Sequence, residues 1–299
     1  NLSLQDFGSE AELIPLLTPE DEEEMNNEEL PNNLAILPLR NMVLFPGVVI
    51  PITAGRDKSI RLINEANAEG KIIGVVAQKN EEDEDPTKND IHKIGTVAKI
   101  LRVLKMPDGN VTVILQGKKR FEIDTVITEN PYIRAEVKEV SEKRPGKHDT
   151  EFVAIVDSIK ELAIQIIKES PNIPSEATFA IKNIESQSFL INFVTSNMNL
   201  TVKEKQDLLA VNALKERALE TLRYMNIELQ KLELKNDIQS KVRFDLDQQQ
   251  REYFLHQQMK TIQEELGGAS QEEEIDEMSV KAKTKKWDAK TAEHFEKEI

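Results

Sequence analysis

The residue types that most often do chemistry are scattered along this 299-residue chain and match no catalytic pattern. Gly146-Lys147-His148 comes nearest to a glycine-rich phosphate loop, in which backbone amides, a lysine and a hydroxyl hold phosphate and its metal. It lacks the earlier glycine and the Ser or Thr after the lysine, so we interpret it as a linker. The sequence predicts no ATP-binding residue in this segment.

The sequence also contains no pattern that indicates metal binding or nucleophilic catalysis. The chain has no cysteine and no G-x-S-x-G pattern, and Gly268-Ala269-Ser270 is typical of a break after a helix. Acidic pairs such as Glu264-Glu265 fall where a solvated helix face is expected. No histidine has metal-ligand spacing. The four are His92, His148, His256 and His294. We predict no catalytic residue, no cofactor and no metal in this segment.

Two basic runs could contact nucleic acid. Lys118-Lys119-Arg120-Phe121 and the lysines of residues 281–286, followed by Trp287, each combine cations with an aromatic side chain. The net charge of −15 opposes phosphate, and no series of aromatics on neighbouring strands offers a stacking platform. A nucleic-acid-binding module is therefore kept as a minor alternative.

Charge and turn residues divide the chain into parts. Residues 1–33 hold ten acidic and no basic residues, which predicts a disordered acidic leader that cannot bury enough apolar surface to offset chain entropy. All twelve prolines and nine of the eleven glycines precede Ser175. The absence of cysteine, of a signal peptide and of a transmembrane run makes the cytoplasm the expected location.

Residues 34–145 are expected to form a β-rich lobe, mainly antiparallel, because short apolar runs alternate with polar residues between turns. A helix is predicted over 57–69. Met106-Pro107-Asp108-Gly109-Asn110 predicts a hairpin turn, and Phe45-Pro46-Gly47 predicts a turn joining two short strands. The predicted strands are 34–39, 48–53, 71–77, 95–104, 111–115, 121–127 and 132–140.

From Asp149 onward the apolar period changes to 3.6, which predicts helices. Residues 146–200 are expected to form a helical bundle, with one helix ending before Pro171 and a second over 175–197. Thr201 and Glu204 have the spacing of a capping box, and no Gly or Pro follows before Gly267. We therefore predict one long, projecting coiled-coil helix over 201–266 and a charged helical segment over 267–299. The fold class is α+β.

Two stretches carry a resemblance to a known family. Residues 37–63, LPLRNMVLFPGVVIPITAGRDKSIRLI, are similar to the opening of the N-terminal domain of Lon ATP-dependent proteases. Residues 250–267, QREYFLHQQMKTIQEELG, resemble the helix before that family's ATPase module, and VILQGKKRFEI between them is also similar. The resemblance covers residues 34–267. It implies a PUA-like pseudobarrel followed by helices.

The same resemblance implies an ATP-driven, homohexameric serine protease that degrades misfolded, damaged and short-lived regulatory proteins with a Ser-Lys dyad. ATP and Mg are implied for the full-length protein, whereas neither ATPase nor dyad motifs occur in this sequence. The chain begins with Asn and stops inside a helical pattern, so we expect a fragment that ends before the AAA+ module.

Two hypotheses for the segment follow. In the first, apolar side chains capture exposed apolar segments of unfolded or damaged proteins and deliver them to the motor. Its candidate contacts, for each of which core or coiled-coil packing is the alternative, are Met42, Phe45, Tyr224 and Met225. In the second, the long helix only holds protomers together and spaces the β lobes. Its candidate assembly residues are Leu222, Leu229 and Leu232. No membrane partner is expected.

Overall fold

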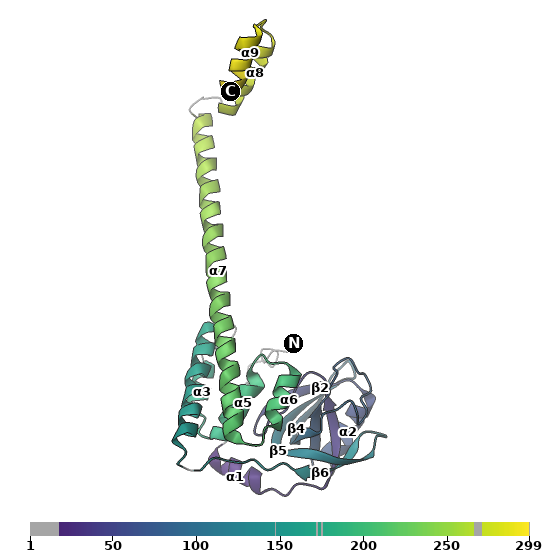
Figure 1. Ribbon diagram of the computed structural model, residues 1–299. Helices are drawn as coiled ribbons and strands as arrows, with labels where there is room; N and C mark the ends of the chain where they lie inside the picture. The colour runs from purple at the N-terminus through teal and green to yellow at the C-terminus, as the bar shows by residue number, and fades with distance from the viewer. Residues whose placement is uncertain (1–17, 147, 172, 175, 266–270, 299) are drawn as a thin grey trace. The chain divides into compact units, whose positions relative to one another are not determined.

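The computed structural model describes residues 18–298 except 147, 172, 175 and 266–270 (Figure 1). The chain divides into two compact units, Asn1–Glu233 and Leu234–Ile299. The predictions for residues 1–17, for Lys147 and for a break at Gly267-Gly268-Ala269-Ser270 lie outside the described residues.

The β lobe is a sheet that closes on itself. Its strand order is β2-β5-β4-β3-β1-β6, and β6 also pairs with β5, so every strand except β2 belongs to a closed ring. Among the pairs of described strands, β1–β3 is the parallel one and the others are antiparallel. The strands are β1 (Asn33–Leu39), β2 (Val49–Ala54), β3 (Ile72–Ala77), β4 (Ile94–Lys105), β5 (Val111–Thr128) and β6 (Arg134–Glu139). With the helices that follow, this pseudobarrel confirms the expected α+β class.

Strand β5 is longer than predicted. The runs expected as separate strands, 111–115 and 121–127, form one strand of 18 residues. The reason is Gly117, where the strand passes directly beneath a neighbouring loop. A Cβ atom there would lie 2.2 Å from the carbonyl oxygen of Phe45. The glycine that interrupts the sequence pattern thus marks a close approach of two backbones and not the end of a strand.

The two predicted tight turns form. Gly47 has a φ of 80°, and the Val48 N–H donates to the Phe45 carbonyl at 3.2 Å. Gly109 has a φ of 87° in the hairpin between β4 and β5. Both conformations are accessible to glycine without steric cost. The prediction that this turn directly joins two short strands is wrong, because residues 40–45 before it are irregular and only β2 follows it, paired with β5.

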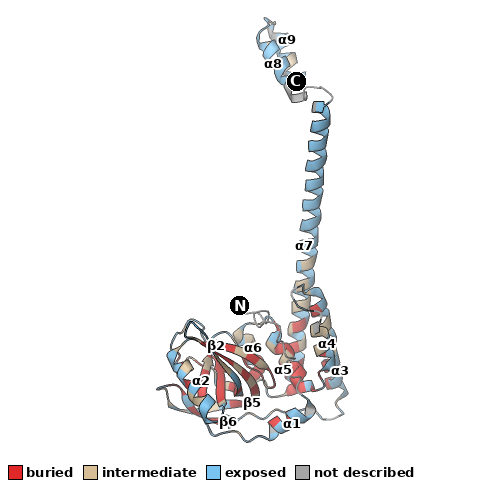
Figure 2. Cartoon of the chain, turned by 180° about the vertical axis from the view of Figure 1, so that it is seen from behind, coloured by how far each residue is buried: buried red, intermediate tan, exposed pale blue. Residues whose placement is uncertain are grey.

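Alternate side chains of the strands enter two apolar clusters on opposite faces. Figure 2 shows that much of the sheet and of helix α5 (Gln187–Asn197) is buried. The smaller cluster includes Ile36, Val97 and Phe121 from the strands. The larger one combines the other strand face, such as Leu37, with bundle residues such as Phe189. The β lobe and the bundle therefore share one continuous core.

The helices differ from the predicted ones at three places. They are α1 (Pro19–Asn27), α2 (Asp57–Glu69), α3 (Thr150–Glu169), α4 (Glu176–Asn183), α5 (Gln187–Asn197), α6 (Val202–Ala210), α7 (Leu214–Glu265), α8 (Gln271–Lys283) and α9 (Ala289–Glu298). Part of the expected disordered leader is helix α1, whose Glu22 and Met25 are buried. The helix expected over 175–197 is two helices, because Ser186 accepts a hydrogen bond from the Phe189 N–H and caps α5.

The third difference is that the single helix predicted over 201–266 is wrong. Helix α6 ends at Ala210 and α7 begins at Leu214. Arg120 Nη1 donates to the carbonyls of Leu209 and Val211, at 2.8 and 2.9 Å. The backbone of Lys143 bonds to Asn212 and Leu214 on the other side of the break. Groups from the β lobe therefore satisfy the backbone atoms freed where the two helices separate.

The capping box at the start of α6 forms as predicted. Thr201 Oγ1 accepts from the Glu204 N–H at 3.2 Å, and the Glu204 carboxylate accepts from the Thr201 N–H at 2.8 Å. We expect Thr201→Ala to lower the free energy of unfolding by about 1 kcal/mol, the usual value for an N-cap. Thr201→Ser keeps the hydroxyl and should cost much less. Urea titrations followed by circular dichroism measure both, and equal losses would contradict the assignment.

Helix α7 changes its environment along its length. Its residues 214–233 belong to the first unit, where Leu214, Ala218 and Met225 are buried. Residues 239–263 are all exposed. No helix within the described ranges combines the length and apolarity needed to cross a bilayer.

Candidate functional site

The predicted substrate contacts do not form one surface. Phe45 and Met225 are completely buried in the larger core cluster, so the prediction that they meet a partner at the surface is wrong. Met42 and Tyr224 are half-buried and pack against the same cluster. The core alternative holds for Phe45 and Met225 because the bundle covers the turn and the first turns of α7.

The predicted assembly residues lie in two different environments. Leu222 packs against the chain's own core, while Leu229 and Leu232 are half-buried further along α7. From Leu232, steps of four, three and four residues along the same helix face lead to polar side chains. These are Asn236, Gln239 and Arg243. A single apolar seam therefore does not run the length of the helix, and the coiled coil remains a prediction.

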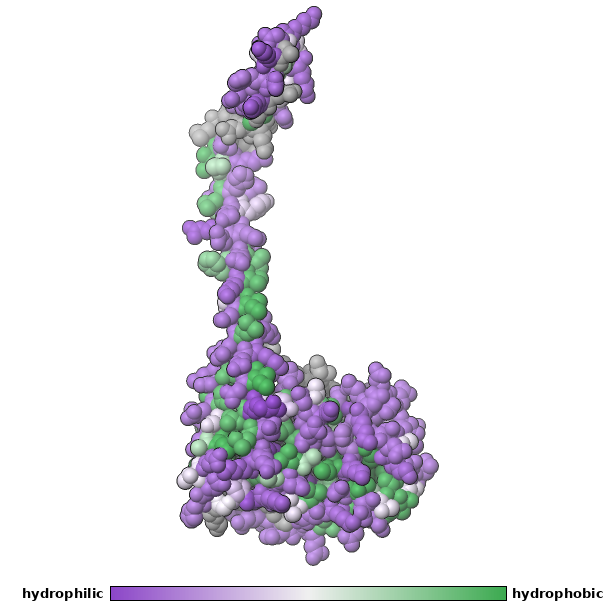
Figure 3. Space-filling model, in the orientation of Figure 1, coloured by the Kyte–Doolittle hydropathy of each residue, from purple (hydrophilic) through white to green (hydrophobic). Residues whose placement is uncertain are grey.

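Sequence reasoning assigned the apolar residues of α7 beyond residue 233 to a coiled coil and did not single them out as a binding surface, whereas many of them are exposed. Periodicity alone could not find it, because an apolar residue on a helix looks the same whether its partner is in the same chain or not. Figure 3 shows hydrophobic side chains along this helix and on the bundle. The exposed ones on α7 beyond residue 233 are Leu234, Ile238, Val242, Phe244, Leu246, Tyr253, Phe254, Leu255, Met259 and Ile262.

The first unit contains a buried charge cluster where β5, the segment after β6 and the bundle meet. Arg217 of α7 is completely buried and donates through Nη2 to the Glu142 carboxylate. Glu142 also accepts from Arg144 Nε at 3.2 Å and from Ser188 Oγ at 3.1 Å. Arg217 Nε and Nη1 have no hydrogen-bond partner within the described part of the chain. Glu142 is thus the one carboxylate bonded to this buried guanidinium.

Arg120 is the second buried guanidinium of the cluster. Burial, with a smaller contribution from the nearby Arg217, lowers the pKa of Arg120 to about 10. The group therefore stays protonated at neutral pH. Its neighbours Lys118 and Lys119 pair with Glu28 and Glu139. The basic run that suggested nucleic acid in the sequence is largely engaged within the fold.

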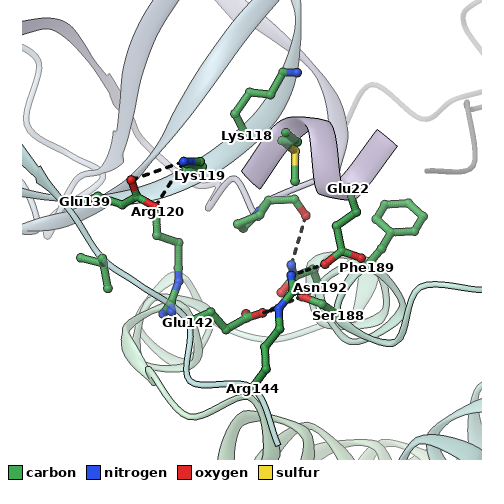
Figure 4. Close-up of a pocket in the computed structure, with 13 residues that line it drawn as sticks. Glu22, Lys118, Lys119, Arg120, Glu139, Glu142, Arg144, Ser188, Phe189 and Asn192 are labelled. Carbon is green, nitrogen blue, oxygen red and sulfur yellow. Dashed lines mark hydrogen bonds and ion pairs between the residues drawn. The ribbon is translucent and has the colours of Figure 1, made fainter. Parts of the chain in front are cut away.

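Helix α1 covers one side of this cluster (Figure 4). The Glu22 carboxylate accepts hydrogen bonds from Arg144 and from the Ser186 hydroxyl, although only 8% of Glu22 is exposed. Ser186 is also the N-cap of α5, so it joins α1 to the bundle. Asn192 Nδ2 donates to the Pro46 carbonyl at 3.1 Å, and both residues line the same pocket as Glu22.

A cavity of about 60 Å³ remains between α1 and these groups. Its lining includes four basic side chains and three carboxylates, one of which is Glu22 of α1. No described group of His, Cys, Asp and Glu residues is arranged to hold a metal. The lining offers neither a cysteine nor a histidine to act as nucleophile or base. Its four basic side chains suit the binding of carboxylates.

Comparisons with known proteins agree on one family. The family model described as "ATP-dependent protease La (LON) substrate-binding domain" matches residues 33–226. The chain is 85% identical over its full length to a "Lon protease" of Flavobacterium johnsoniae, of which it spans 37%. It is 49% identical over 96% of its length to a "Lon protease" of Cytophaga hutchinsonii, of which it spans 35%.

A solved structure is similar in fold. The "N terminal domain of Mycobacterium avium complex Lon protease" superposes on this chain with a TM-score of 0.54 at 20% identity. The match covers 65% of this chain and 98% of that one.

Proposed function

This chain belongs to the family of ATP-dependent protease La (LON) substrate-binding domains, and from that premise we propose that it captures exposed apolar segments of unfolded or damaged proteins. The relatives are about three times longer than the chain, so ATP-driven unfolding, cleavage by a Ser-Lys dyad and hexamer formation belong to the proposal for the whole protein. A bacterial cytoplasmic location is part of the same proposal.

One observation carries the proposal. Ten large apolar side chains of α7 beyond residue 233 are at least half exposed. Many large apolar side chains that their own chain leaves exposed favour a contact with another molecule. Met259 adds a flexible thioether side chain that adapts to partners of different shape.

The same side chains suit weak binding of many sequences. They lie on several faces of α7 with polar residues between them, so no single face offers one deep pocket. An unfolded chain that touches several such points gains affinity through effective concentration. We therefore attribute capture to many modest contacts and not to one specific site.

ATP and Mg have no part in this step. The sequence has no glycine-rich phosphate loop, and the residues present do not fit a nucleotide. We propose that both act in the whole protein through residues that this sequence does not contain.

Substitutions on α7 test the proposal. Replacing Phe254, Leu255, Met259 and Ile262 together by serine should weaken binding of an unfolded protein at least about tenfold, or roughly 1.4 kcal/mol, because the apolar contacts are lost. The measurement is fluorescence anisotropy with labelled, reduced and alkylated α-lactalbumin at two salt concentrations.

A matched variant with four exposed polar residues of the same helix replaced by serine controls for the change of helix propensity. These are Gln249, Gln250, Gln258 and Gln263. Binding that is equally strong in both variants would refute apolar capture through α7. Loss of binding in high salt would instead favour a charged mechanism, including nucleic-acid binding.

A structural role is the second candidate. The half-buried Leu229 and Leu232 favour it, since neither belongs to the core of the first unit. Sedimentation of the Leu229→Ser, Leu232→Ser variant discriminates the two functions. Lost assembly with retained capture would assign these residues to protomer contacts alone.

A further inference from the structure

Helix α1 is held to the first unit by few contacts. It is strongly acidic, with the sequence PEDEEEMNN, and among its residues of described burial Glu22 and Met25 are the buried ones, three positions apart on one face. Just after the helix, Glu28 pairs with Lys118 at 3.2 Å. The side chains of Asp21, Glu23 and Glu24 are exposed. A carboxylate, a methionine and one flanking ion pair thus make most of the attachment.

The groove under α1 complements these groups. Arg144 and Ser186 hold the Glu22 carboxylate, and Pro46 and Phe189 line the same cavity as Met25 (Figure 4). Carboxylates bonded to guanidinium groups form stronger hydrogen bonds than neutral pairs do. The groove therefore binds a carboxylate and an unbranched apolar side chain that lies one helical turn later on the same helix face.

The groove is also positively charged in a chain of net charge −15. Without Glu22, the charged lining consists of two carboxylates, Glu139 and Glu142, and four cations. The cations are Lys118, Lys119, Arg120 and Arg144. Arg120 is 3% exposed, and its Nη2 has no hydrogen-bond partner within the described residues. Removing α1 would leave a local excess of two positive charges and a spare buried donor.

We propose that this groove is a binding site for acidic helical segments of protein substrates with a Glu or Asp followed three residues later by Met or Leu, and that α1 occupies it in cis. The inference rests on the proposed function, because it assigns to a capture domain a second class of substrate. Substrates of this class compete with α1 for the groove. A substrate therefore binds only when its concentration or affinity is high enough to displace the helix.

The competition from α1 is strong because an intramolecular occupant acts at high effective concentration. The five residues from Glu28 to Asn32 join α1 to β1 and keep the helix close to the groove. A free acidic segment must bind strongly enough to displace α1 at this effective concentration. Weakening α1 should therefore increase the apparent affinity for such segments without any change in the groove.

A peptide titration tests this in the full chain. The probe is a labelled peptide of residues 18–28, TPEDEEEMNNE, with an unrelated acidic helical peptide of the same Glu-x-x-Met pattern as a second probe. The protein variant Glu22→Gln, Met25→Ser should release α1. Both peptides should bind it with a Kd at least tenfold lower than for the unsubstituted protein. Hydrogen exchange of α1 should be faster in the variant.

Matched changes separate specific binding from general attraction of negative charge. Peptides carrying Gln and Ser at the Glu and Met positions keep most of their charge and should lose binding at least tenfold. Arg144→Gln in the released variant should weaken binding by a similar factor, and Lys118→Gln, at the rim, by less. Circular dichroism of each variant verifies that it is folded.

Four outcomes would overturn the proposal. These are equal binding to the released and unsubstituted proteins, no binding to the folded released variant, indifference to Arg144→Gln, and dimerisation of the unsubstituted chain by exchange of α1 in light scattering. The serine variant of α7 described above should bind the peptides normally. Failure at the groove with intact capture of unfolded α-lactalbumin therefore leaves the proposed function standing.

Discussion

Replacing Glu142 by alanine should lower the free energy of unfolding by about 3–5 kcal/mol, one of the two largest effects expected for a single substitution in this chain. The substitution removes the one carboxylate that, among the described residues, is bonded to Arg217, whose side chain is completely buried. A buried charge without a counter-charge is far more costly than a buried pair. Arg144 and Ser188 lose an acceptor at the same time.

Two companion variants identify the cause. Glu139→Ala removes a carboxylate that is partly exposed and paired with Lys119 at 3.3 Å, and should cost at most about 1 kcal/mol. Arg217→Met in the Glu142→Ala protein removes the uncompensated charge and should recover much of the loss. If the double variant is no more stable than Glu142→Ala, the buried charge is not the reason.

Urea unfolding followed by far-ultraviolet circular dichroism is the suitable measurement for these variants. The chain has a single tryptophan, Trp287, and it lies in the second unit. Tryptophan fluorescence would therefore not report on the unit that contains the charge cluster.

Replacing Phe45 by alanine should lower the free energy of unfolding by about 3–5 kcal/mol, as truncation of a buried aromatic side chain does. Phe45 is completely buried in the core that the β lobe and the bundle share. Phe45→Leu keeps most of the apolar volume and should cost clearly less. The same urea titrations measure both.

The Phe45 variants also separate core packing from substrate contact. At temperatures where the protein is folded, Phe45→Leu should bind unfolded α-lactalbumin with unchanged affinity. A selective loss of binding at unchanged stability would show that the side chain reaches the surface during capture. In that case the role predicted from the sequence would be restored.

Local patterns in the sequence determined much of the fold. The helix over Asp57–Glu69, the turns at Gly47 and Gly109 and the capping box at Thr201 all occur where predicted. Each depends on residues at most a few positions apart, through side-chain period, allowed φ values or a cap. Such interactions can be recognised without knowing what packs against them. The two family-like stretches are similarly continuous in the sequence, so they indicated the family without any knowledge of tertiary contacts.

The tertiary structure alone decided where helices α6 and α7 separate and which groups meet in the charge cluster around Glu22 and Glu142. Nothing in residues 211–213 marks a helix end, yet Arg120 and Lys143 from the β lobe separate α6 from α7. Helix α1 in the acidic leader begins with a local capping box of Thr18 and Asp21, and the bonds of Glu22 to Arg144 and Ser186 decide where the helix packs.

The physical reason is the same in each case. Burial and ion pairing join residues that are tens to more than a hundred positions apart, and periodicity does not encode which partner a side chain meets. Arg217 looks like any charged residue of a helix until Glu142 and the surrounding core exclude water from it. The sequence alone thus determined many of the elements and the family, whereas packing determined where some helices end and which residues are accessible for binding.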